Sequence, residues 1–164
     1  MMEQSTLREN EVSASLPSGG DAHLHFIGTV RTPWQSRGDA PRQGDINGPL
    51  CTIEVFDHWD LALKGIEKYR TLEILYWLHE SRRDIVLQSP ANNGEVHGTF
   101  SIRSPVRPNP IATSIVQVVS ITGNRILVRG MDCIDGTPLL DIKPERSLVL
   151  PIAPPKGVHP MDVE

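Results

Sequence analysis

Hydrophobic and polar residues alternate along several short stretches of the chain, which is the period of β-strands that bury one face. Between Ile121 and Arg125, a Thr-Gly-Asn sequence is typical of a hairpin turn. Pro144 ends the last of these stretches. The predicted strands are His23–Arg31, Cys51–Phe56, Thr71–His79, Val96–Arg103, Ile111–Ile121, Arg125–Met131 and Leu139–Lys143.

Two stretches depart from simple alternation. Thr71–His79 is so apolar that we expect it to be covered on both faces, as a barrel strand or at a subunit interface. Asp57 is a suitable N-cap for a short helix through about Lys68, in which Leu61, Ile66 and Trp59 are expected to face inward.

The order of these elements predicts the fold class. Strands follow one another without alternating helices, so the chain is expected to be mainly β, as a compact antiparallel β-barrel with one or two short helices. Residues 1–20 are polar and predicted to be a disordered tail, residues 21–147 form the barrel domain, and residues 148–164 form a Pro-rich C-terminal tail.

Composition narrows the functional classes. The chain has 164 residues with a net charge of −4, so only a local basic patch would favour nucleic acid. The two cysteines, Cys51 and Cys133, cannot form a disulfide framework, which predicts a reduced, cytoplasmic protein. No secretory signal is expected at the polar N-terminus, and no apolar run approaches the ~20 residues of a membrane helix.

Several common catalytic motifs are missing. The sequence contains no Gly-rich phosphate loop, no H-E-x-x-H or C-x-x-C pair, and no G-x-S-x-G element. We therefore expect neither a metal site nor serine hydrolase chemistry.

Four polar clusters at predicted loops or strand ends remain as candidate sites. They are Pro41–Gln43, His79–Glu80, Ser101–Ser114 and Asp132–Pro144. Each has an ordinary structural alternative: a surface turn, a hydrogen-bonded edge histidine, a Pro-rich crossover and a self-satisfied hairpin loop, respectively.

The stretch Ser101–Ser114 is the most unusual, since it holds prolines at positions 105, 108 and 110. Each proline fixes its own φ angle and extends the preceding residue. The side chains of Arg103, Arg107 and Asn109 are thereby held at little entropic cost, and rigid arginines suit carboxylate or phosphate groups.

These clusters, taken in order, resemble a known family. The sequences Arg103-Ser-Pro-Val-Arg-Pro-Asn-Pro-Ile111 and Asp135-Gly-Thr-Pro-Leu-Leu-Asp-Ile-Lys-Pro144, preceded by Pro-Arg-Gln and an apolar strand ending in His, are similar to the TrmO/YaeB/VirR family of S-adenosylmethionine-dependent methyltransferases. The resemblance runs from about Phe26 to Pro144. Family members commonly have Gly where this chain has Ala112, and an aromatic residue where it has Glu145.

The resemblance implies a β-barrel homodimer with the cofactor pocket near the subunit interface, and methylation of N6 in threonylcarbamoyl-adenosine beside the tRNA anticodon. Arg31, Arg37, Arg42 and Arg107 would have to cluster to contact the tRNA. The residues expected to bind the cofactor are Pro41, Arg42, Gln43, His79, Glu80, Arg103, Thr113, Cys133, Ile134, Asp135, Gly136 and Thr137, while Arg107 and Asn109 would touch the substrate.

The catalytic base and the acceptor stay open at this point. Asp141 and His79 are the leading candidates for a base, with Asp135 as a third. Two other functions fit the same motifs: a regulatory β-barrel module that binds S-adenosylmethionine without transferring its methyl group, and a methyltransferase with a different acceptor.

Overall fold

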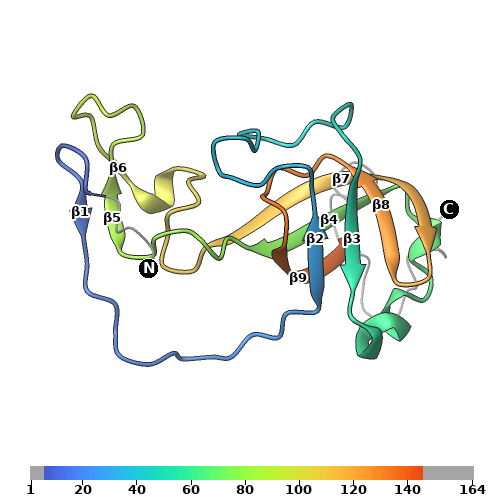
Figure 1. Ribbon diagram of the computed structural model, residues 1–164. Coiled ribbons are helices and arrows are strands. Elements are labelled where there is room, and N and C mark those ends of the chain that lie inside the picture. Colours follow the sequence, from blue (N-terminus) through green and yellow to red (C-terminus); the bar gives the residue numbers. More distant parts are fainter. Residues whose placement is uncertain (1–5, 146–164) are drawn as a thin grey trace, which may run out of the picture.

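The computed structural model describes residues 6–145 and consists mainly of β-strands (Figure 1). The expected Pro-rich tail at 148–164 lies outside these residues. The strands are β1 (Val12–Ser13), β2 (Gly28–Arg31), β3 (Cys51–Val55), β4 (Thr71–Trp77), β5 (Ile85–Gln88), β6 (His97–Gly98), β7 (Ile111–Thr122), β8 (Arg125–Arg129) and β9 (Thr137–Pro144). Three short 3₁₀-helices are η1 (Asp57–Leu63), η2 (Ile66–Lys68) and η3 (Thr99–Ser101).

Six strands close into an antiparallel barrel in the order β2-β3-β8-β7-β4-β9, which confirms the predicted fold class. Strand β2 closes the sheet because it pairs with β3 on one side and with β9 on the other. The predicted hairpin is present as β7 and β8, which meet at the Thr122–Arg125 pair. Closure leaves no unpaired barrel edge.

The barrel core is built from the alternating residues of these strands. In β4, the side chains of Leu72, Ile74 and Tyr76 are buried, while the residues between them are only partly covered. The strand is thus a barrel strand, as one of the two predicted alternatives had it, and of its two faces only the inward one is fully buried, because the other points outward.

The region after β3 also differs from the single short helix that the sequence predicts. It forms as two 3₁₀-helices, and Asp57 is the first helical residue, while Phe56 occupies the N-cap position without a side-chain hydrogen bond. Leu61 is 87% exposed rather than buried. The period-3.6 pattern misplaces this side chain because a 3₁₀-helix has three residues per turn.

Between β4 and β7 the chain leaves the barrel and forms β5 and β6, which join β1 of the N-terminal segment in a separate three-stranded sheet ordered β1-β5-β6 (Figure 1, left). The prediction of one strand over Val96–Arg103 is wrong, because only His97–Gly98 is extended in a sheet and η3 follows at once. In the N-terminal segment, Val12 and Ser13 form β1 and pair with β5. The hydrophobic pattern predicts neither of these two strands. No helix among the described residues is long and apolar enough to cross a membrane.

The packing of the barrel predicts that a larger residue at position 28 destabilises the protein, since Gly28 lies in β2 between β3 and β9. A Cβ atom there would lie 2.0 Å from the carbonyl oxygen of Glu54, so Gly28→Ala must displace a paired strand. We expect the free energy of unfolding to fall by about 1–3 kcal/mol, the usual cost of overpacking. Urea denaturation followed by circular dichroism measures this change.

Gly98→Ala is the matched control, since a Cβ atom on Gly98 would meet no other atom within 4 Å. We expect its unfolding free energy to stay within about 0.5 kcal/mol of the wild type. Equal stability of the two variants would show that the β2 backbone does not pack as described.

Candidate functional site

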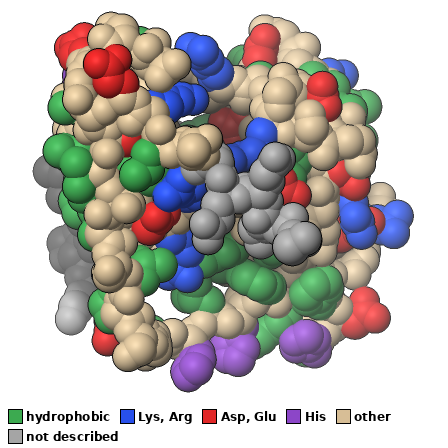
Figure 2. All heavy atoms as spheres, turned by 60° about the vertical axis from the view of Figure 1, so that its left-hand side comes forward, with side chains coloured by type: hydrophobic (Ala, Val, Ile, Leu, Met, Phe, Trp, Pro, Cys, Tyr) green, Lys and Arg blue, Asp and Glu red, His purple; other side chains and the backbone are tan. Residues whose placement is uncertain are grey.

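One large cavity of about 1260 Å³ lies where the barrel meets the segment inserted between β4 and β7. Its walls come mainly from five parts of the chain: the loop 37–44, the end of β4 with residues 78–81, the Pro-rich stretch 100–107, the start of β7 (111–115), and the segment after β8. In Figure 2 the hollow on this face is surrounded by Lys and Arg side chains. The cavity joins polar loops to an apolar barrel interior.

Most of the side chains expected from the sequence do converge on this cavity. They are Pro41, Arg42, Gln43, His79, Glu80, Arg103, Arg107, Thr113, Cys133, Ile134 and Thr137. Because these residues come from segments up to about a hundred positions apart, the closed barrel is what brings them together.

Four of the predicted residues lie elsewhere. The Asp135 carboxylate accepts a hydrogen bond from the Thr32 amide at 3.1 Å, and Gly136 donates its amide to the Val30 carbonyl. The Asn109 carboxamide contacts Arg83. Asp141 lines a second cavity of about 530 Å³ beside η1 and η2, and its carboxylate is bonded to Lys143.

The loop that carries Pro41–Gln43 is held against the barrel by backbone packing. A Cβ atom on Gly44 would lie 1.7 Å from the Gly130 carbonyl oxygen, so only glycine permits this approach. At the other end, the Arg129 guanidinium bonds the Gly48 carbonyl. The two contacts fix the loop beside the end of β8.

The Pro-rich stretch is anchored by side chains of the inserted segment. The Gln88 amide donates to the Val106 carbonyl at 2.6 Å, and Arg83 donates to the Pro108 carbonyl at 2.6 Å. Arg107 turns back on its own loop, donating to the Ser104 carbonyl at 3.0 Å. Arg107 thus helps to fold the loop, although its side chain also lines the cavity.

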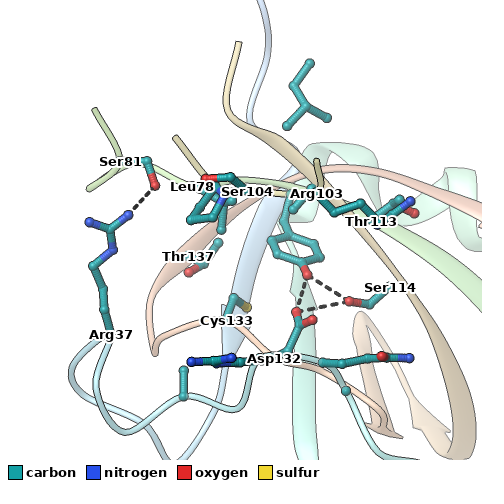
Figure 3. Close-up of a pocket in the computed structure, with 18 of the residues that line it drawn as sticks. Arg37, Leu78, Ser81, Arg103, Ser104, Thr113, Ser114, Asp132, Cys133 and Thr137 are labelled. Carbon is teal, nitrogen blue, oxygen red and sulfur yellow. Dashed lines mark hydrogen bonds between the residues drawn. The ribbon is translucent and has the colours of Figure 1, made fainter. Parts of the chain in front are cut away.

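The remaining arginines differ in their freedom to bind a ligand. Arg37 donates to the Ser81 hydroxyl at 2.7 Å, as Figure 3 shows, and Arg31 pairs with Glu54 at 3.1 Å on the barrel exterior. Within residues 6–145, neither Arg42 nor Arg103 has a hydrogen bond or ion pair. These two guanidinium groups are therefore available at the cavity.

A polar cluster that the sequence analysis did not single out lies deeper in the cavity. The hydroxyl of Tyr76 donates to Asp132 Oδ1, and Ser114 Oγ lies 2.7 Å from the Tyr76 oxygen and 3.1 Å from the same Asp132 oxygen (Figure 3). The one available signal was a tyrosine at an inward position of an apolar strand, since a buried tyrosine hydroxyl needs a partner.

The ionisation of this region follows from its burial. The pKa of the Tyr76 hydroxyl lies above its ordinary value, first because the group is buried and second because Asp132 is negatively charged. Burial also raises the pKa of the Cys133 thiol to about 12. Both groups are therefore protonated at neutral pH. No group of three metal-ligating side chains occurs among the residues that the structure describes.

Comparisons with known proteins identify the family of this chain. The profile of the tRNA-methyltransferase O N-terminal domain matches residues 29–147. The probable S-adenosyl-L-methionine-binding protein VirR of Rhizobium radiobacter is 64% identical over 154 residues, covering 94% of this chain and 88% of VirR. A mouse tRNA (adenine(37)-N6)-methyltransferase is 37% identical over 126 residues, which are 72% of this chain but only 29% of the mouse protein.

A solved structure shares the architecture. The crystal structure of TrmO from P. aeruginosa superposes with a TM-score of 0.66 at 27% identity, covering 83% of this chain and 60% of the TrmO chain. The present chain thus spans more than half, but less than two thirds, of that protein. From the profile match and these relatives, we conclude that the chain belongs to the tRNA-methyltransferase O family, whose N-terminal domain it represents.

Proposed function

We propose that the protein is an S-adenosylmethionine-dependent methyltransferase that modifies N6 of an adenine beside the tRNA anticodon. The observation that carries this proposal is the convergence of eleven predicted cofactor and substrate residues on one cavity. Relatives named for S-adenosyl-L-methionine binding and for tRNA (adenine(37)-N6) methylation support it.

The cavity suits the chemical groups of this cofactor. Its volume of about 1260 Å³ exceeds the ~300–1,000 Å³ of common small-ligand sites, so room remains for part of an acceptor. The Arg103 guanidinium, which has no hydrogen bond or ion pair within residues 6–145, matches a carboxylate, and the carboxylate of Glu80 matches an ammonium group. Apolar side chains such as Leu78 and Ile134 offer a wall for a planar ring.

When bound, the cofactor supplies an electrophilic methyl group on a sulfonium centre. The chain contributes mainly position, because in-line displacement depends on alignment of the acceptor nitrogen with that methyl group. The Pro-rich stretch serves this purpose, since its anchored backbone holds Arg103 before a ligand arrives and less rotamer entropy is lost on binding.

Arg103→Ala is expected to raise the Kd for S-adenosylmethionine about 10- to 100-fold, because a charge-assisted hydrogen bond contributes roughly 1.5–3 kcal/mol. Isothermal titration calorimetry measures this. Arg125→Ala is the matched control, since Arg125 is an exposed arginine that pairs with Glu54 away from the cavity. No binding by the wild type at millimolar cofactor would contradict the proposal.

We propose more specifically that the acceptor is threonylcarbamoyl-adenosine. This modified base carries a carboxylate, and Arg42 is a second cavity arginine without a hydrogen bond or ion pair within residues 6–145, so its guanidinium can bind that carboxylate. A labelled-methyl assay on tRNA with and without the threonylcarbamoyl group tests the acceptor. Equal transfer to both tRNAs would identify unmodified adenine as sufficient.

The mouth of the cavity carries an aromatic ring suited to RNA. Phe100 in η3 is 82% exposed and lies beside the arginines of the Pro-rich stretch. Stacking of a base on an aromatic side chain contributes about 1–3 kcal/mol. We expect Phe100→Ala to raise the KM for tRNA about tenfold while leaving the Kd for S-adenosylmethionine unchanged.

Leu61→Ala is the control, because it also removes an exposed apolar side chain. Leu61 lies in η1, and other residues of η1 line the second cavity rather than the large one. Steady-state kinetics of both variants should differ only in the KM for tRNA. A weaker affinity of Phe100→Ala for the cofactor alone would place the ring against the cofactor's adenine.

The regulatory alternative also has support, because the VirR relative is named only for binding S-adenosyl-L-methionine. A binding module would give the calorimetric signal without transferring methyl groups to tRNA. The same labelled-methyl assay run on a cell extract distinguishes a third possibility, an acceptor other than tRNA.

We further propose that the protein is a homodimer that uses the outward face of β7. This face carries the exposed side chains of Ile111, Ile115 and Val119. Ile111 and Ile115 also line the cavity, so a second copy seated on this face would cover one side of the site. Large exposed apolar faces commonly mark interfaces.

Val119→Lys is expected to shift the protein from dimer to monomer, because an apolar interface cannot accommodate an unpaired charge. Size-exclusion chromatography with light scattering measures the mass in solution. Val86→Lys on β5 is a control with a similarly exposed valine. A monomeric wild type at micromolar concentration would rule out this dimer.

A further inference from the structure

The polar cluster of Tyr76, Ser114 and Asp132 suggests a chemical role within the proposed function, on which this inference rests. The three side chains come from β4, β7 and the segment after β8, and all of them line the cavity. Tyr76 is only 2% exposed and Ser114 only 8%. A mostly apolar barrel interior thus holds a carboxylate that is hydrogen-bonded within a cluster with two hydroxyl groups.

The direction of the hydrogen bonds can be worked out from the chemistry of the groups. A phenol has one proton, and Tyr76 donates it to Asp132 Oδ1. Ser114 then donates either to the tyrosine oxygen or to the same Oδ1 atom. Tyr76 therefore bonds one carboxylate oxygen of Asp132, and Ser114 supports that oxygen either directly or through the tyrosine hydroxyl. No hydrogen bond from the described residues occupies Oδ2.

Other possible proton acceptors are less suitable. The Cys133 thiol stays protonated because it is buried, and Asp141 lies at the second cavity beside Lys143. Asp135 is held by the Thr32 amide and lies 3.7 Å from Arg31.

Two further groups, His79 and Glu80, do line the cavity, but their side chains are 36% and 50% exposed and lie 4.0 Å from each other. They follow the end of β4, whereas Tyr76 and Ser114 lie within barrel strands and bond Asp132 from there. Asp132 is therefore the best-supported acceptor of a proton inside the cavity.

We propose that Asp132 is the catalytic base, and that Tyr76 and Ser114 are positioning residues that fix its carboxylate. The lone pair of N6 in adenine is delocalised into the ring, so removal of a proton makes the nitrogen a better nucleophile. The N–H bond breaks and its proton goes to Asp132 Oδ2. The nitrogen lone pair forms the new N–C bond while the S–C bond breaks, and that electron pair returns to sulfur as a neutral thioether.

The test is Asp132→Asn, which keeps the shape and hydrogen-bonding capacity of the side chain but cannot take up a proton. We expect kcat for methyl transfer to tRNA to fall at least 100-fold. The Kd for S-adenosylmethionine by calorimetry and the Kd for tRNA by filter binding should stay within about twofold of the wild type. Asp141→Asn is the matched control and should retain the wild-type kcat.

Tyr76→Phe provides the second variant, because it keeps the ring in the core and removes one donor to Asp132. We expect kcat to fall about tenfold with both KM values unchanged, a split that loss of packing alone would not produce. Should Asp132→Asn fail to fold, as judged by circular dichroism, this split decides the proposal.

Two results would overturn the assignment. A normal kcat for Asp132→Asn at saturating cofactor would exclude it as the base, and a large rise in its Kd for S-adenosylmethionine with kcat unchanged would make it an ammonium ligand instead. Failure of the proposed function is separate, since in that case the wild type itself would transfer no methyl group to tRNA.

Discussion

Closure of the sheet is the constraint on which the rest of this molecule depends. Pairing of β2 with both β3 and β9 satisfies the backbone groups that an open sheet would leave unpaired. It also fixes strand register, so inward positions such as Leu72 and Val116 stay buried together. Because the strand ends are fixed, the loops at the barrel rim begin and end at fixed positions. Their side chains can therefore converge on one cavity although the loops contain no long helix or strand.

The inserted segment between β4 and β7 gives the barrel its cavity. It leaves at Leu78, whose amide bonds the Pro110 carbonyl at 2.8 Å, and it returns through the Pro-rich stretch directly into β7. The departing and returning strands are thereby tied together at one point. The segment carries its own small sheet and forms one wall of the site, while the barrel supplies the opposite wall and the polar cluster.

Charge is distributed locally rather than globally. The chain has a net charge of −4, yet four arginines line one cavity, in which Glu80 and Asp132 are the only acidic lining residues among positions 6–145. Such a site can attract anionic ligands although the protein as a whole is acidic. Salt screens charges that lie more than about 8–10 Å away, so the nearby arginines dominate at the cavity. The two arginines that pair with loop groups, Arg37 and Arg107, shape the site, which leaves Arg42 and Arg103 free for ligands.

Several features of the protein were already determined by the sequence. Alternating or strongly apolar runs identified the six barrel strands, although β2 begins at Gly28 rather than at the predicted His23. The stiff Pro-rich stretch marked one wall of the cavity, because the backbone constraint that a proline imposes can be read from the local sequence. The sequence pattern failed where tertiary packing overrides propensity, as in the 3₁₀ geometry that exposes Leu61 and in the two-residue β6. Tertiary structure alone decided which polar groups meet: Tyr76 and Asp132 are 56 positions apart, and only the closed barrel makes them partners, while it turns Asp135 and Asp141 away from the cavity.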